Sequence, residues 1–195
     1  YTKGRELYWE TSANGRTWSD DRKLAGMGGH YQVSGVRDGL VASFFNYHPG
    51  GDVDKRTNLY YVQTRDFGRT WTTIDGQPLE FPLSAVNCPA LAVDYAAQGK
   101  NQYACDLNFD REGRPLLLHV TSRGYEPGPE NDPREFCLTR WDGRAWQTGT
   151  ITRTDHNYDM GSIWASGDEW KVIAPTLPGS TASCPTSAGS ARSMR

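Results

Sequence analysis

Short runs of apolar residues, separated by turn-forming residues, dominate this chain. Alternating side chains point to opposite faces of a strand, so these runs predict β-strands. The predicted strands are Leu40–Tyr47, Gln102–Asp110, Pro115–Ser122, Phe136–Trp141 and Trp170–Ala174. Turns are expected where glycine and aspartate cluster, at Gly35–Gly39, Asp110–Gly113 and Asp142–Gly143. No segment of about 12 residues has the apolar period of a helix, so the pattern predicts an all-β chain.

An internal repeat organises the first half of the chain. Leu7–Trp18 reads LYWETSANGRTW and Tyr60–Trp71 reads YYVQTRDFGRTW. The two tryptophans lie 53 positions apart, which is close to the length of one propeller blade. Weaker copies occur at Thr139–Trp146 and Trp164–Trp170, each with a glycine turn between apolar residues.

Each full copy predicts a hairpin turn followed by a buried aromatic residue. Asp66 is expected to accept backbone N–H bonds within its turn, and Gly68 to supply a positive φ. Asp66, Gly68 and Trp71 should therefore lie on one tight hairpin. Trp18 and Trp71 open the returning strands and are expected to bury their large apolar faces.

The composition excludes several classes of partner. The 195 residues include 21 basic and 23 acidic side chains, so no general affinity for nucleic acid or an anionic membrane is expected. No run approaches the roughly 18 apolar residues of a membrane-spanning helix. The four cysteines are widely spaced without a C-x-x-C pair, and their disulfide state cannot be read from the sequence.

The last 16 residues differ in kind from the rest. From Ser180 the sequence reads STASCPTSAGSARSMR, rich in Ser, Ala and Gly and without a strand pattern. We therefore expect one body over residues 1–179 and a disordered or non-native tail over residues 180–195. A frameshift or a truncated reading frame is favoured over a natural tail.

Several segments resemble a known family. TRDFGRTW at Thr64–Trp71 matches the Asp-box of sialidase-like propellers at every position, whereas the copy at Thr11–Trp18 has Ala13 in place of the aspartate. Longer segments resemble the BNR-4 repeat family, which is similar in fold to ulvan-type polysaccharide lyases: Gly29–Gly35, Phe45–Tyr61, Thr121–Arg134 and Asp155–Ser162.

This resemblance covers nearly everything from Leu7 to Gly179. It implies an incomplete β-propeller of four-stranded antiparallel blades, roughly half a ring. It also implies that the Asp boxes are structural, which makes Asp66 a poor catalytic candidate. An enzyme acting on polysaccharide is expected to be secreted or periplasmic, although no signal peptide is visible in this chain.

Lyase chemistry requires a particular set of side chains. The C5 proton of a uronate becomes acidic when the carboxylate is neutralised, and a His or Tyr then removes it. The candidates for proton transfer are His30, His48, Tyr95 and Tyr158. The candidates for substrate binding are Arg56, Arg111, Arg123, His156 and Asn157.

The similar lyases combine His, Tyr and Arg in one site. The resemblance places His30 and Tyr95 in corresponding segments, with Arg111 at about the right distance downstream. His119 follows an apolar run and is expected to face a neighbouring strand. At least three of six side chains should converge on one face, opposite the Asp66 turn: His30, His48, Tyr95, Arg123, His156 and Tyr158.

Three functions remain open at this point. The favoured one is a polysaccharide lyase that cleaves a uronate-containing glycan by β-elimination. The alternatives are an exo-glycoside hydrolase of the sialidase superfamily, part of whose site this fragment would lack, and a non-catalytic glycan-binding propeller. No cofactor is predicted, and the oligomeric state is open. Asp52, Asp54, His156 and Asp159 are suitable ligands for a divalent metal, but their spacing favours solvated loops.

Overall fold

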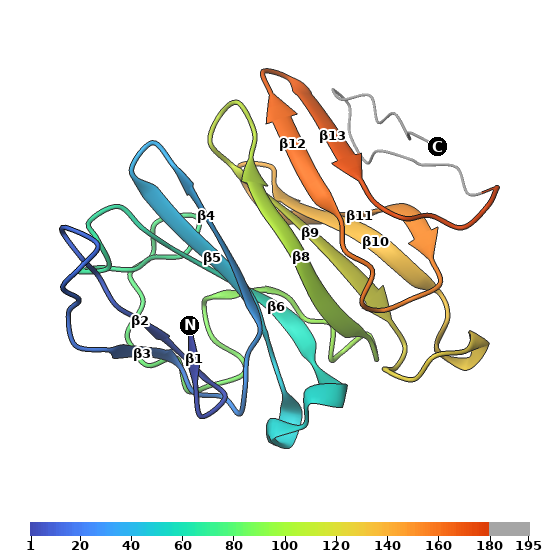
Figure 1. Cartoon of the computed structure of the whole chain (residues 1–195), viewed down its shortest axis with the longest axis horizontal. Helices are drawn as coiled ribbons and strands as arrows, with labels where there is room; N and C mark the ends of the chain where they lie inside the picture. Colours follow the sequence, from blue (N-terminus) through green and yellow to red (C-terminus); the bar gives the residue numbers. More distant parts are fainter. Residues whose placement is uncertain (180–195) are drawn as a thin grey trace. The chain divides into compact units, whose positions relative to one another are not determined.

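The computed structural model describes residues 1–179 and divides into two compact units (Figure 1). The first unit is Tyr1–Asp94 and the second begins at Tyr95. The described residues form β-strands and three short 3₁₀ turns, which confirms the all-β prediction. The tail predicted at residues 180–195 lies outside the described part of the chain.

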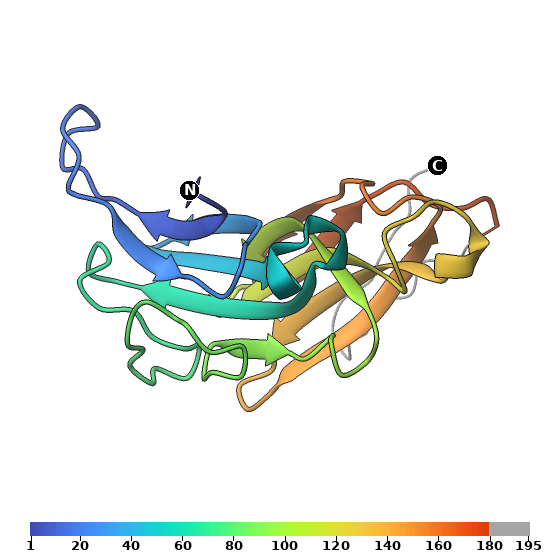
Figure 2. The ribbon, with the colours of Figure 1, turned by 90° about the horizontal axis from the view of Figure 1, so that it is seen from below.

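The first unit contains a three-stranded and a four-stranded antiparallel sheet. The smaller sheet has the order β1 (Thr2–Lys3), β2 (Glu6–Trp9) and β3 (Arg22–Ala25). The larger sheet has the order β4 (Gln32–Arg37), β5 (Leu40–Tyr47), β6 (Thr57–Thr64) and β7 (Leu91–Val93). Two 3₁₀ turns, η1 (Pro49–Gly51) and η2 (Val53–Lys55), lie at the end of the β5–β6 hairpin (Figure 2, teal).

Aromatic and branched side chains from both sheets fill the core of the first unit. Phe45 on β5 stacks on Tyr60 of β6, with ring centroids 5.3 Å apart. The other buried members of this core come from both sheets and from the long β6–β7 connection: Leu7, Leu24, Ala25, Val62, Trp71, Leu83 and Ala90. Burial of this apolar surface is the main term that holds the two sheets of the unit together.

The second unit repeats the plan with a four-stranded and a two-stranded sheet. The larger sheet has the order β11 (Trp146–Thr154), β10 (Arg134–Trp141), β9 (Pro115–Ser122) and β8 (Asn101–Phe109). The smaller sheet pairs β12 (Ser162–Ser166) with β13 (Glu169–Ile173), and η3 (Pro129–Asn131) lies before β10. The Asp106 carboxylate accepts the Ile163 N–H at 2.7 Å and so joins β8 to β12.

The predicted strands agree closely with the observed ones. Leu40–Tyr47 and Pro115–Ser122 have the predicted bounds, and the others differ by one or two residues at an end. A turn lies within the predicted range Gly35–Gly39 but is shorter than predicted, because Gly35 lies inside β4 and pairs with Ala42. The chain reverses only at Asp38 and Gly39, whose φ values of 49° and 77° suit a two-residue hairpin turn.

The Asp66 turn, residues Thr64–Trp71, is one hairpin as predicted. The Asp66 carboxylate accepts the Thr70 N–H at 2.9 Å, and the Thr64 hydroxyl accepts the Gly68 N–H at 3.0 Å. These backbone and hydroxyl bonds from Thr70 lower the pKa of Asp66 to about 2. Trp71 is 6% exposed, so its predicted burial is confirmed. The Asp66 carboxylate therefore stabilises the hairpin.

The first copy of this turn, Thr11–Trp18, uses a different acceptor. Asn14, one position after Ala13, accepts the Thr17 N–H at 2.9 Å. Ser12 accepts the Gly15 N–H at 2.8 Å. The predicted burial of Trp18 is wrong, since this side chain is 60% exposed. The physical reason is that β3 begins only at Arg22, so Trp18 lies in the loop before the strand.

Replacing Asp66 with alanine is expected to lower the melting temperature of the protein by about 5 °C, because two hydrogen bonds to Thr70 are lost. Asp168→Ala is the matched control, since Asp168 sits on another hairpin turn and makes only an exposed ion pair with Arg111. Calorimetry of the two variants tests this directly. Equal melting temperatures for both would show that the Asp66 bonds contribute nothing.

Candidate active site

His48 is a buried histidine at the end of β5. Its backbone N–H donates to the Gly29 carbonyl at 2.9 Å, and the residue is only 2% exposed. Neither ring nitrogen has a hydrogen-bond partner among the described residues. A buried polar group without a partner costs free energy, and such groups concentrate at functional sites.

Two glycines shape the backbone around His48. Gly28 and Gly29 have φ values of 123° and 152°, in a region that L side chains rarely adopt. A Cβ atom on Gly29 would lie 2.7 Å from Nδ1 of His48, and one on Gly28 would lie 2.8 Å from the His48 carbonyl oxygen. Gly29 is therefore required by the close approach of the His48 imidazole, and Gly28 by the close approach of the His48 backbone carbonyl.

Tyr31 and two arginines surround the same histidine. The Tyr31 and His48 rings lie 4.9 Å apart, and the Arg56 guanidinium stacks on Tyr31 at 4.7 Å from the ring centroid. Arg5 donates a hydrogen bond to the Gly51 carbonyl in the adjoining turn. Burial, and then Arg56, His30 and Arg5, lower the pKa of His48 to about 4. At neutral pH the imidazole is uncharged and has a lone pair available for a proton.

His30 lies close to this site, but both of its ring nitrogens already have hydrogen-bond partners. Nδ1 lies 2.8 Å from the Asn46 carbonyl oxygen, to which it donates, and Nε2 accepts the Met27 N–H at 3.4 Å. Both interactions fit a neutral imidazole, and burial lowers its pKa. His30 therefore positions the Gly29–Tyr31 segment, while His48 has nitrogens available for chemistry.

Tyr95 in the second unit is paired with His119. The Tyr95 hydroxyl lies 2.7 Å from Nε2 of His119, and Nδ1 of His119 lies 3.2 Å from the Leu117 carbonyl oxygen. Burial lowers the pKa of His119 to about 4, so the ring is neutral, donates to Leu117 and accepts from Tyr95. Burial also raises the pKa of Tyr95, which holds the phenol in its protonated form.

Asn157 and Arg134 hold the loop between β9 and β10. Arg134 is buried, and its Nε donates to the Asn157 side-chain oxygen at 2.8 Å. The Asn157 amide donates to the carbonyls of Gly124 and Tyr125 at 3.1 and 2.9 Å. In this structure Asn157 therefore anchors the loop, whereas Arg123 at the start of the same loop is exposed.

The other predicted residues of the second unit lie at its surface. His156 is exposed and Tyr158 is 51% exposed, with their rings 5.6 Å apart and the Tyr158 N–H donating to Nδ1 of His156. Arg111 is exposed and forms an ion pair with Asp168 at 3.2 Å.

The structure thus places the predicted residues in separate groups. His30, His48 and Arg56 come together within the first unit. The convergence predicted for six side chains joins residues of both units and stays a prediction. Sequence reasoning missed Tyr31 and Arg5 beside His48. The glycine pair before His30 is a signal of close backbone approach that could have indicated Tyr31, whereas nothing local marks Arg5.

Residues 1–179 contain neither a clustered metal site nor a membrane-spanning helix. No group of three or more His, Cys, Asp or Glu side chains in this range is placed to hold a metal ion. Within the same range, no helix is long and apolar enough to cross a membrane. Cys88, Cys105 and Cys137 form no disulfide bond among the described residues.

Known structures resemble the chain in fold. A polysaccharide lyase, the PL25 ulvan lyase, superposes with a TM-score of 0.67 at 16% identity over 84% of this chain and 42% of that one. The same lyase bound to -[GlcA(1-4)Rha3S]- gives a TM-score of 0.66 at 15% identity, with the same coverage. The chain thus spans less than half the length of these lyases. At this identity the likeness shows the fold, which is the predicted incomplete β-propeller of antiparallel blades.

A match in sequence identifies the family. No curated protein matches the chain. The BNR_4 profile, described as "BNR repeat-containing family member", matches residues 2–154, which is most of the sequence. The chain therefore belongs to the BNR repeat-containing family.

Proposed function

We propose that this protein is a polysaccharide lyase that cleaves a uronate-containing glycan by β-elimination. The observation that carries the proposal is His48, a neutral buried imidazole whose ring nitrogens have no partner among the described residues and which two arginines flank. The fold likeness to a polysaccharide lyase supports it. Such polymers are met outside the cell or in the periplasm, so the proposal includes a secreted or periplasmic location.

The proposed reaction uses three kinds of side chain. Arg5 and Arg56 supply the positive field that binds the uronate carboxylate and makes the C5 proton more acidic. His48 removes that proton, and the electron pair of the C5–H bond forms the C4–C5 double bond as the C4–O bond breaks. The Tyr31 hydroxyl gives its proton to the leaving oxygen. His48 then returns its proton to Tyr31, which restores the site.

Binding of the substrate would also strengthen the base. The pKa of His48 is low partly because Arg56 and Arg5 repel the imidazolium form. A carboxylate bound between these groups adds a negative charge and offsets that repulsion, which raises the pKa of His48 towards neutrality. The base therefore gains strength when its substrate is present. In the second unit, Tyr95 is less suited to act as a base, because burial raises its pKa.

An ultraviolet assay on a panel of uronate polysaccharides tests the proposal. A lyase product carries a C4–C5 double bond conjugated with the carboxylate, and its absorbance rises with turnover. Reducing ends without that absorbance would indicate the exo-glycoside hydrolase. Retention of a polysaccharide without cleavage would indicate a glycan-binding propeller. Either result would reject the lyase.

A further inference from the structure

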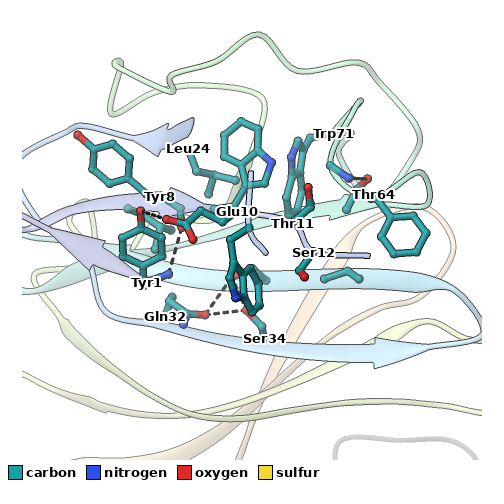
Figure 3. Close-up of a pocket in the computed structure, with 17 residues that line it drawn as sticks. Tyr1, Tyr8, Glu10, Thr11, Ser12, Leu24, Gln32, Ser34, Thr64 and Trp71 are labelled. Carbon is teal, nitrogen blue, oxygen red and sulfur yellow. Dashed lines mark hydrogen bonds between the residues drawn. The ribbon is translucent and has the colours of Figure 1, made fainter. Parts of the chain in front are cut away.

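A cavity of about 520 Å³ opens in the first unit, away from His48 (Figure 3). Six aromatic side chains line it, and we call it the aromatic groove: Tyr1, Tyr8, Trp9, Trp18, Phe67 and Trp71. Four of these are held by packing in two pairs. Trp9 meets Trp71 edge-on with ring centroids 5.7 Å apart, and Tyr1 stacks on Tyr8 with ring centroids 6.0 Å apart. Trp18 and Phe67, by contrast, are 60% and 79% exposed and present free ring surface.

Polar groups gather on one side of the aromatic groove. The Gln32 side-chain oxygen accepts the Ser34 hydroxyl at 2.7 Å and the Ser43 hydroxyl at 3.3 Å (Figure 3 shows the first). Glu10 is the only charged side chain in the lining, and it accepts the Tyr1 hydroxyl at 2.8 Å. Aromatic faces combined with a few hydroxyl and amide groups are typical of a ligand pocket for a neutral, partly apolar molecule.

A second cavity of about 460 Å³ adjoins the aromatic groove. Its charged side chains are basic, whereas the charged side chain of the groove is the acidic Glu10. We call this second cavity the arginine pocket; it shares Trp9 and Phe67 with the aromatic groove and adds Arg22 and Arg69. Both arginines are exposed, and neither has an ion-pair partner among residues 1–179. The lining of this pocket contains no acidic residue.

The missing aspartate of the first repeat explains that charge. Ala13 lines the arginine pocket at the position where the second repeat has Asp66. The turn keeps its shape because Asn14 accepts the Thr17 N–H instead. The substitution thus removes a carboxylate from a cationic pocket without loss of the hairpin, and this combination favours an anionic ligand.

We propose that the aromatic groove and the arginine pocket form a second glycan-binding site, separate from His48, for a neutral sugar ring next to an anionic one. The neutral ring stacks on Trp18 in the groove, and the carboxylate of the adjacent uronate binds Arg22 and Arg69. The inference rests on the proposed function only for the class of ligand, a uronate glycan. A second site of this kind would hold the polymer to the enzyme between cleavage events, because two linked sites bind more tightly than either alone.

Calorimetric titration with oligosaccharides of alternating glucuronate and neutral hexose tests this site. The His48→Gln variant serves as the parent so that the ligand is not cleaved, and a carboxyl-reduced oligosaccharide serves as the uncharged probe. Trp18→Ala should weaken binding of both probes about tenfold, which is about 1.4 kcal/mol. Arg69→Gln and Ala13→Asp should each weaken only the acidic probe, again by about tenfold, because a charge-assisted hydrogen bond is lost or opposed.

Arg16→Gln is the matched control. Arg16 occupies the position of the other turn that corresponds to Arg69, is also exposed, and lines neither cavity. Its loss should change the affinity by less than about twofold. Equal effects of Arg16→Gln and Arg69→Gln, or full affinity in Trp18→Ala, would overturn the site. So would a dimer that Trp18→Ala converts to a monomer, since the groove would then bind a second copy of the chain.

The outcomes separate this inference from the proposed function. Binding that depends on Trp18 and Arg69 without any ultraviolet product from the unmutated protein would reject the lyase and leave the second site standing. A lyase whose affinity is unchanged by Trp18→Ala, Arg69→Gln and Ala13→Asp would reject the second site alone.

Discussion

Replacing His48 with glutamine is expected to lower the kcat of glycan cleavage by about 10²- to 10⁴-fold, the usual range for loss of a general base. Glutamine has a similar size and polarity but cannot take up a proton at neutral pH. The ring nitrogens of His48 make no hydrogen bond to the described residues, so the substitution removes none. The free energy of unfolding in urea should therefore agree with that of the parent within about 0.5 kcal/mol.

A second variant displaces the same imidazole without replacing His48 itself. Gly29→Ala places a methyl group 2.7 Å from Nδ1 of His48, and the ring must move to admit it. We expect a loss of kcat with little change in KM, because the carboxylate-binding arginines are untouched. If both variants remain folded and His48→Gln keeps more than about a third of the kcat, His48 is not the base.

Acidification is expected to destabilise the second unit by up to about 3 kcal/mol between roughly pH 6.5 and pH 4. Unfolded histidine titrates near its ordinary pKa of about 6.5, whereas burial lowers the pKa of His119 to about 4. Between these values the unfolded chain binds a proton that the folded chain does not, so stability is full above the higher value and is lost as the pH falls. His48 acts in the same direction in the first unit, because its pKa is also lowered to about 4.

Urea unfolding at about pH 7 and about pH 4 measures this effect. His119→Gln is the control, since an amide can still accept the Tyr95 hydroxyl and donate to Leu117 but does not titrate. Its stability should fall less with acid than that of the parent. Asp66 contributes little to this measurement, because its pKa falls from the ordinary 3.8 to about 2 on folding, so most of its stabilisation is lost below about pH 4. Parallel losses in both proteins would show that other groups cause the acid sensitivity.

Much of the fold could be predicted from local pattern. The runs at Leu40–Tyr47 and Pro115–Ser122 gave the strand bounds, since period-two patterning and turn residues are properties of neighbouring positions. The exposure of Trp18 could not be predicted in this way. Whether an aromatic residue packs depends on where the next strand begins, and here β3 begins only at Arg22.

Local sequence pattern could predict less of the candidate site than of the fold. The sequence selected both His30 and His48, and residue type alone cannot rank them. Their difference arises from Asn46, whose carbonyl oxygen lies 16 positions from His30 in the chain but 2.8 Å from its ring. No corresponding partner reaches His48 among the described residues. Long-range hydrogen bonds of this kind are set by strand pairing, which the sequence pattern does not encode residue by residue.

The Asn14 turn bears on how distant members of such a family can be detected. A search that demands an acid in one fixed column would discard Thr11–Trp18, because that column holds Ala13. The hairpin nevertheless keeps its oxygen acceptor, displaced by one residue, and its amide donors remain satisfied. A search that accepts Asp or Asn at either of the two positions before the glycine would recover this degenerate copy. It would also allow the count of blades in divergent propellers to rest on hydrogen-bonding capacity instead of on letter identity.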